Sequence, residues 1–161
     1  MILLFAFGLR ICRLNQLELF GDELDVGYHA YSLWTTGRDY LGQKMPFYIH
    51  SFSEWRAPLL MYLTAPFVGV LGLNHWGVRL PPLILGIFNI LLFYLLVKDL
   101  TKDENVGLIT ALILAITPWH IHYSRAAFEV TLLLFLILLG TLAFLKEKWF
   151  LAAVSLSLIH I

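Results

Sequence analysis

Three carboxylates and a histidine lie close together near the start of the chain, at Asp22, Glu23, Asp25 and His29. They follow an apolar segment directly, where ionised side chains are unfavourable unless they face water or serve a function. A helix that Asp22 caps and that runs to about Trp34 would place Asp22, Asp25 and His29 on one face, with Glu23 pointing elsewhere. A carboxylate on such a face can accept a proton from a hydroxyl group. The structural alternative is a capped helix with a solvated acidic face.

Arginines form the second set of residues that could do chemistry. A guanidinium group donates two parallel charge-assisted hydrogen bonds and therefore suits a phosphate group better than an ammonium does. Arg79 precedes an apolar run, and its alternative role is to anchor a helix end. Arg125 lies four residues before Glu129, so a simple ion pair on a helix is its alternative role. For Arg10 and Arg13 the alternative is snorkelling from a helix end into water.

Histidines give only sparse metal-binding patterns. His50 and Glu54 are spaced i, i+4, and His120 and His122 lie two residues apart after Pro118, which favours a strand or loop over a helical zinc pair. The pair of His120 and His122 has no third ligand nearby. A divalent metal therefore stays open as a cofactor, with His50 and Glu54 as its candidate ligands.

The composition of the chain determines where such residues must be placed. Hydrophobic residues make up 60% of the 161 residues and charged residues only 14%, and the mean hydropathy is +0.79. This composition excludes a disordered chain. Eleven basic residues balance eleven acidic ones, which argues against a nucleic-acid partner, and Cys12 alone cannot form an internal disulfide. A soluble domain of this length cannot bury so many apolar side chains, so the sequence predicts a membrane protein.

Apolar runs separated by short charged loops predict membrane-spanning helices. The runs cover residues 80–97, 106–119 and 130–145, with a further run that begins at Trp149 and the outer part of a first helix at residues 1–11. The two loops that hold Lys98, Lys102, Lys146 and Lys148 are expected on the cytoplasmic side. Residues 13–56 and 120–129 are then non-cytoplasmic, and this is consistent only if residues 57–73 form an interfacial or re-entrant helix. The predicted fold is an all-α polytopic transmembrane bundle whose long non-cytoplasmic first loop contains juxtamembrane helices.

Four short motifs follow one another in a recognisable order. They are Asp22-Glu23 with Tyr28, then Glu54-Trp55-Arg56-Ala57-Pro58-Leu59-Leu60, then Asn74-His75-Trp76-Gly77-Val78-Arg79-Leu80, and finally Ser124-Arg125-Ala126-Ala127-Phe128-Glu129. This ordered set resembles the polytopic glycosyltransferases of the GT-C fold that take sugars from polyprenyl-phosphate carriers. Protein O-mannosyltransferases and lipid A aminoarabinose transferases belong to that group. The resemblance extends to about residue 145.

The resemblance implies roles for the matched positions. Asp22 matches the catalytic carboxylate that acts as base toward the acceptor hydroxyl, and Glu23 is its usual neighbour. The positions implied to bind donor phosphate or substrate are Tyr28, Glu54, Arg56, Arg79, Arg125 and Glu129. Two departures put details in doubt, because Glu129 stands where the family often has aspartate and Trp55-Arg56-Ala57 replaces a shorter acidic-Lys-Pro form. The implied partners are a polyprenyl-phosphate-linked sugar, an acceptor protein, lipid or glycan, and the lipid bilayer.

Residues 1–155 are accordingly expected to be the N-terminal part of a transmembrane glycosyltransferase domain, inactive by itself, in the plasma (inner) membrane with its site on the non-cytoplasmic face. Residues 156–161 match one reading frame of a sequencing adapter, and a natural leucine-rich helix is the alternative. The alternative function is a non-enzymatic polytopic protein, such as a transporter subunit or a scaffold. A transporter would be expected to carry ionisable groups near the midplane of its spans, whereas these runs hold Asn89 and a few Ser or Thr residues.

Overall fold

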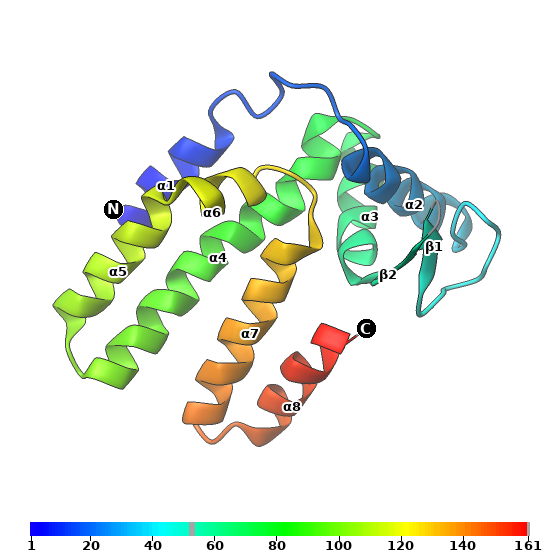
Figure 1. Cartoon of the computed structure of the whole chain (residues 1–161). Helices are drawn as coiled ribbons and strands as arrows, with labels where there is room; N and C mark the ends of the chain where they lie inside the picture. Colours follow the sequence, from blue (N-terminus) through cyan, green and yellow to red (C-terminus); the bar gives the residue numbers. More distant parts are fainter. Residues whose placement is uncertain (52–53, 161) are drawn as a thin grey trace.

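The computed structural model describes residues 1–51 and 54–160, and most of these residues lie in helices (Figure 1). The elements are, in chain order, α1 (Ile2–Ile11), α2 (Asp22–Thr36), β1 (Ile49–Ser51), β2 (Glu54–Arg56), α3 (Leu59–Leu71), α4 (His75–Thr101), α5 (Glu104–Ile116), α6 (Pro118–Tyr123), α7 (Glu129–Leu145), α8 (Trp149–Ser157) and the 3₁₀ turn η1 (Leu158–His160). The predicted apolar runs correspond to α4, α5 and α7. The adapter origin of residues 156–161 stays a prediction.

Helix α4 is longer than the apolar run that predicted it. The side chain of Asn74 caps its start, accepting hydrogen bonds from the backbone N–H groups of Trp76 at 2.9 Å and Gly77 at 3.0 Å. The helix has 27 residues and is therefore about 40 Å long. Of the residues that the structure describes, only those of α4 form a helix long and apolar enough to cross a membrane by length and composition. The number of spans stays a prediction.

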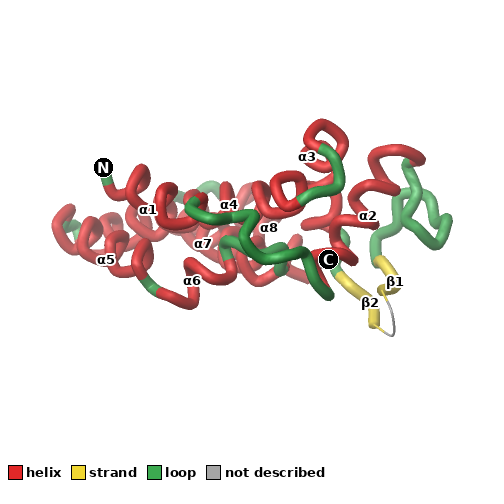
Figure 2. The backbone as a smooth tube through the Cα atoms, turned by 90° about the horizontal axis from the view of Figure 1, so that it is seen from above, coloured by secondary structure: helices red, strands yellow, loops and turns green. Residues whose placement is uncertain are grey.

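Helices α1, α5 and α7 pack against α4 in a layered arrangement, and α8 folds back along α7 (Figures 1 and 2). At one end of this arrangement, Nζ of Lys146 at the end of α7 forms an ion pair of 3.2 Å with Oδ2 of Asp99 in the last turn of α4. Arg79 lies near the opposite end of α4. The lysine-bearing loops and the predicted site residues are therefore separated by most of the length of α4.

Helices α2 and α3 form a lobe beside the start of α4. Their facing side chains are apolar and buried, among them Val26 and Ala30 on α2 and Met61 and Val68 on α3. Helix α3 has 13 residues, so it is about 20 Å long and shorter than the roughly 30 Å hydrocarbon core. Helix α5, whose segment is predicted to span the membrane, has the same number of residues, so length does not distinguish the two. The interfacial or re-entrant placement of residues 57–73 stays a prediction.

A short hairpin adds two strands to the mostly helical fold that the sequence predicted. Strands β1 and β2 pair antiparallel, with Ile49 opposite Arg56 and His50 opposite Trp55. The β-branched and aromatic residues of this segment favour a pleated backbone over a helix. Because Arg56 ends the second strand, the hairpin fixes the position of this side chain relative to α2.

The segment with two histidines also differs from its prediction. We predicted a strand or loop for His120 and His122, but both lie in the short helix α6. Pro118 occupies the first turn of that helix, where its missing N–H has no intrahelical partner to lose. The helix places His120 in the interior, with 2% of its surface exposed.

Candidate functional site

The acidic motif lies at the start of α2, as predicted. Asp22 is the first helical residue, whereas the cap position belongs to Gly21, which has a φ of +47° and makes no side-chain cap hydrogen bond. The predicted helix is therefore confirmed, but the predicted capping role of Asp22 is wrong. A positive φ is readily adopted by glycine. Because Asp22 does not bond the backbone at the cap, its carboxylate is available to a partner from another element.

That partner is Arg56 from the hairpin. Its Nη2 donates a short hydrogen bond to Oδ1 of Asp22, and its Nη1 lies 4.0 Å from Oδ2 of Asp25 and 3.9 Å from Oε1 of Glu129. The side chain of Arg56 is 14% exposed and that of Asp22 is 40% exposed. Three carboxylates thus surround one guanidinium group, which leaves an excess of negative charge with Asp22 at its solvent-facing edge.

The pKa of Arg56 reflects this surrounding. Burial by itself lowers that pKa, but the hydrogen bond with Asp22 and the charges of Glu129, Asp22 and Asp25 outweigh it, so the pKa is raised above its ordinary value. Arg56 is therefore a permanent cation. It orients the carboxylate of Asp22, which is the group that can accept a proton from a hydroxyl.

Behind Arg56, Asp25 and His29 are buried on the same face of α2. The Nε2 atom of His29 lies 3.7 Å from Oδ1 of Asp25, and the imidazole packs on Tyr40 with ring centres 3.9 Å apart. Burial lowers the pKa of His29, and the charge of Arg56 adds to this, against the opposing effects of Asp25 and Asp39. The neutral form of His29 is thus favoured. Because His29 then carries no charge, Arg56 is the cation that lies near Asp25. The predicted common face of Asp22, Asp25 and His29 is confirmed.

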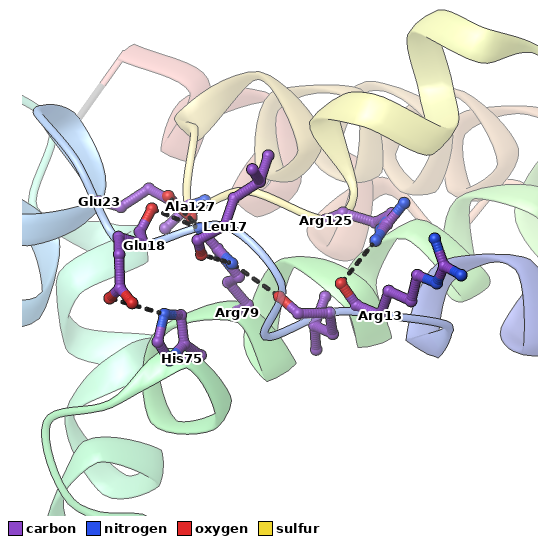
Figure 3. A network of polar contacts seen from close by, with 9 residues as sticks. Arg13, Leu17, Glu18, Glu23, His75, Arg79, Arg125 and Ala127 are labelled. Atoms are coloured by element: carbon purple, nitrogen blue, oxygen red, sulfur yellow. Dashed lines mark hydrogen bonds and ion pairs between the residues drawn. The ribbon is translucent and has the colours of Figure 1, made fainter.

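Glu23 points away from this face and meets Arg79 (Figure 3). Nε and Nη2 of Arg79 donate to Oε1 and Oε2 of Glu23, each at 2.7 Å. Both side chains are buried, at 6% exposed for Arg79 and 1% for Glu23. The pair is a bidentate ion pair in the interior, the geometry in which such pairs are strongest.

The remaining donors of Arg79 bind the loop between α1 and α2. Nη1 donates to the carbonyl oxygens of Leu14 at 2.6 Å and Leu17 at 2.8 Å, and Nη2 donates to that of Glu18 at 3.2 Å. All five N–H groups of the guanidinium therefore have acceptors within the protein. This arrangement leaves no donor for a phosphate and favours a positioning role over the donor contact that the resemblance implied.

Arg125 and Glu129 diverge instead of pairing with one another. Nη2 of Arg125 donates to the carbonyl oxygens of Cys12 at 2.8 Å and Arg13 at 3.1 Å, whereas Glu129 begins α7 and faces Arg56. Between them, the N–H of Ala127 donates to Oε1 of Glu23 at 3.4 Å. The alternative of an i, i+4 ion pair is therefore wrong, because the chain from Ser124 to Phe128 is a turn and not a helix.

The other predicted site residues lie around the acidic face. Tyr28 is 55% exposed on α2. His50 lies on β1 and contacts the edge of Trp55, with ring centres 5.1 Å apart. Glu54 belongs to β2, but its side chain lies outside the described part of the structure. Within residues 1–51 and 54–160, no group of three or more His, Cys, Asp or Glu side chains is placed to hold a metal ion.

Sequence reasoning missed a buried arginine network at the end of α1. Arg10 is 0% exposed, so snorkelling into water is wrong for this residue. Its Nε donates to Oγ of Ser124 at 2.9 Å, Nη1 donates to two backbone carbonyls, and Nη2 lies 2.7 Å from Nδ1 of His120. An arginine inside an apolar run was the available signal, because ionisable residues at membrane depth have partners or functions.

Comparisons with known proteins match the chain to a family of mannosyltransferases. Residues 55–158 match the family model described as dolichyl-phosphate-mannose-protein mannosyltransferase. A protein of Bacillus subtilis (strain 168) described as a proposed mannosyltransferase, YycA, is 29% identical over 107 residues. That alignment covers 63% of this chain and 16% of the relative, so the chain spans a small part of the length of the protein it matches. No solved structure matches.

Proposed function

Because the chain belongs to the dolichyl-phosphate-mannose-protein mannosyltransferase family, we propose that it is part of a membrane glycosyltransferase that uses a polyprenyl-phosphate-linked sugar. The acceptor is a hydroxyl group of a protein, lipid or glycan, and the site faces the non-cytoplasmic side of the plasma membrane. The family description and the name of the relative both refer to mannose, so mannose is the first sugar to test. The fold proposed for the whole protein is the GT-C polytopic bundle.

The observation that carries this proposal is the Asp22–Arg56 pair at the exposed edge of a buried acidic cluster. In the proposed reaction, Asp22 accepts the proton of the acceptor hydroxyl as its oxygen forms a bond with the anomeric carbon. The bond from that carbon to the phosphate oxygen breaks in the same step, and the electron pair leaves with the polyprenyl phosphate. A single displacement of this kind inverts the anomeric centre. Its catalysis consists mostly of positioning and electrostatics.

The remaining residues are proposed to support Asp22. Arg56 holds the carboxylate in its orientation, and Glu129 and Asp25 balance the charge of Arg56. Glu23 and Arg79 act as positioning residues, since their bidentate pair joins the start of α2 to α4. Tyr28 and Glu54 stay candidate substrate contacts. No step in this proposal requires a metal ion.

The test is single-turnover transfer from a polyprenyl-phosphate sugar by the full-length product of the gene. Asp22→Asn keeps the size and hydrogen-bonding capacity of the side chain but removes the proton acceptor. We expect transfer to fall by about 100-fold or more while donor binding persists. Asp99→Asn is the matched control, since Asp99 pairs with Lys146 at the far end of α4. Unchanged transfer by Asp22→Asn would remove Asp22 from the reaction and favour a non-enzymatic function.

A further inference from the structure

Three arginines at the end of α1 and in the α6–α7 turn have no carboxylate partner among the described residues. They are Arg10, Arg13 and Arg125. The acceptors of buried Arg10 are a hydroxyl, two carbonyls and the imidazole of His120. Burial and the charge of Arg10 lower the pKa of His120 to about 4, so this imidazole is neutral at pH 7. The charge of Arg10 is therefore not neutralised by any group that it contacts.

Arg13 and Arg125 line the same two hollows, of about 340 Å³ and 540 Å³. Figure 3 shows Arg125 reaching the backbone carbonyl oxygen of Arg13, at 3.1 Å. Nε of Arg125 is buried and has no hydrogen-bond partner in the described structure, and the side chain of Arg13 makes no hydrogen bond there. Arg13 is exposed, so water screens its repulsion from Arg125, but two like charges that line the same hollows still attract an anion between them.

The nearest acidic residues are directed elsewhere. Glu23 lines the smaller hollow, but both of its oxygens bind Arg79. Glu18 also lines it, yet its carboxylate is 94% exposed and its Oε2 lies 3.4 Å from Nε2 of His75. Both pairs are drawn in Figure 3. The hollows therefore keep an excess of positive charge.

We propose that the space lined by Arg13 and Arg125, between the end of α1 and the α6–α7 turn, binds the phosphate group of an anionic bilayer lipid. Two guanidinium groups can donate paired hydrogen bonds to phosphate oxygens, and the free Nε of Arg125 supplies one donor. The larger hollow is also lined by Gly8 and Leu9 of α1, which form an apolar wall beside the charges. Leu4 and Phe5, farther along α1, are 77% and 51% exposed and offer an apolar surface for an acyl chain.

This site is separate from the one proposed for sugar transfer. Glu23 lies between the lipid site and the transfer site. Its buried carboxylate accepts hydrogen bonds from Arg79 and from the N–H of Ala127. On one side Arg125 reaches the end of α1, and on the other Glu129 reaches Arg56. The lipid site is also opposite in charge to the acidic cluster, and it does not depend on the proposed transferase activity.

The test is native mass spectrometry of the full-length product of the gene, released from nanodiscs that contain phosphatidylglycerol and phosphatidylcholine in equal amounts. We expect phosphatidylglycerol to be retained preferentially and its apparent Kd to rise about tenfold in Arg13→Ala. This substitution removes no hydrogen bond that the structure describes, so the fold should be kept. Arg38→Ala is the matched control, since Arg38 is exposed and its side chain bonds a single carbonyl, that of Gly42. Arg125→Lys should retain only part of the preference, because lysine keeps the charge but loses the fork.

Competition measurements identify the source of the phosphate. If phosphatidylglycerol stays bound when millimolar inorganic phosphate or equimolar polyprenyl phosphate is added, the bilayer-lipid assignment holds. Displacement by inorganic phosphate would show a simple anion site, and displacement by polyprenyl phosphate would assign the hollow to the donor; either result overturns the proposal. Equal retention in Arg13→Ala, Arg125→Lys and the control would overturn it as well.

Discussion

The Glu23–Arg79 pair offers a direct way to distinguish a positioning role from contact with donor phosphate. Arg79→Met keeps much of the side-chain volume but leaves the carboxylate of Glu23, which is 1% exposed, without its cation. Removing one member of a buried ion pair destabilises a protein by roughly 3–5 kcal/mol, because the other charge stays buried and unpaired. We therefore expect the free energy of unfolding of the chain to fall by about that amount.

The double variant gives the more specific result. Glu23→Gln removes the buried charge, so Arg79→Met in that background leaves no unpaired carboxylate. The loss in the double variant should be smaller than the sum of the two single losses by about 1–3 kcal/mol. Unfolding in detergent micelles, followed by circular dichroism against denaturant, measures all three differences. Lys146→Met is the control, since its exposed ion pair with Asp99 is expected to contribute nothing measurable.

Two results would contradict the positioning role of Arg79. If Arg79→Met unfolds no more easily than Lys146→Met, the five hydrogen bonds of Arg79 do not hold the fold together. If the same variant also weakens the binding of a polyprenyl-phosphate sugar, Arg79 is a donor contact, as the sequence resemblance implied. The positioning role would then be wrong.

Two further predictions concern stability. The pKa of His120 is lowered from 6.5 to about 4, so the unfolded chain takes up this proton first as the pH falls. The associated stability is complete above about pH 6.5 and is lost toward pH 4, by about 3 kcal/mol in total, and this part of the pH dependence should vanish in His120→Gln. A Cβ on Gly86 would collide with Cβ of Ser124, so Gly86→Ala should destabilise the chain by about 1–3 kcal/mol. Gly8→Ala, where nothing lies within 4 Å, should be neutral or stabilising, and thermal unfolding of both variants checks the contrast.

The sequence determined most of the helices, though not α6, and the order of the motifs. The long apolar run ending at Val97 predicted α4, and the acidic residues after Gly21 predicted the start of α2. These features are local, because hydrophobic runs and helical spacing depend on residues a few positions apart. The family also followed from the order of short motifs. Predictions for single positions within these motifs were less reliable, since Asp22 begins its helix but does not cap it.

The tertiary structure decided which charges meet. Glu23 and Arg79 are 56 residues apart, and Asp22 and Arg56 are 34 apart, so no local spacing could pair them. Spacing did favour a pair between Arg125 and Glu129, but a turn at that point sends the two side chains to different partners. The hairpin that carries Arg56 and the complete burial of Arg10 left only indirect signals in the sequence, and neither signal indicated a partner. An arginine satisfies its donors with whichever acceptors the fold brings near, and those acceptors here are mostly carbonyls and carboxylates of distant segments.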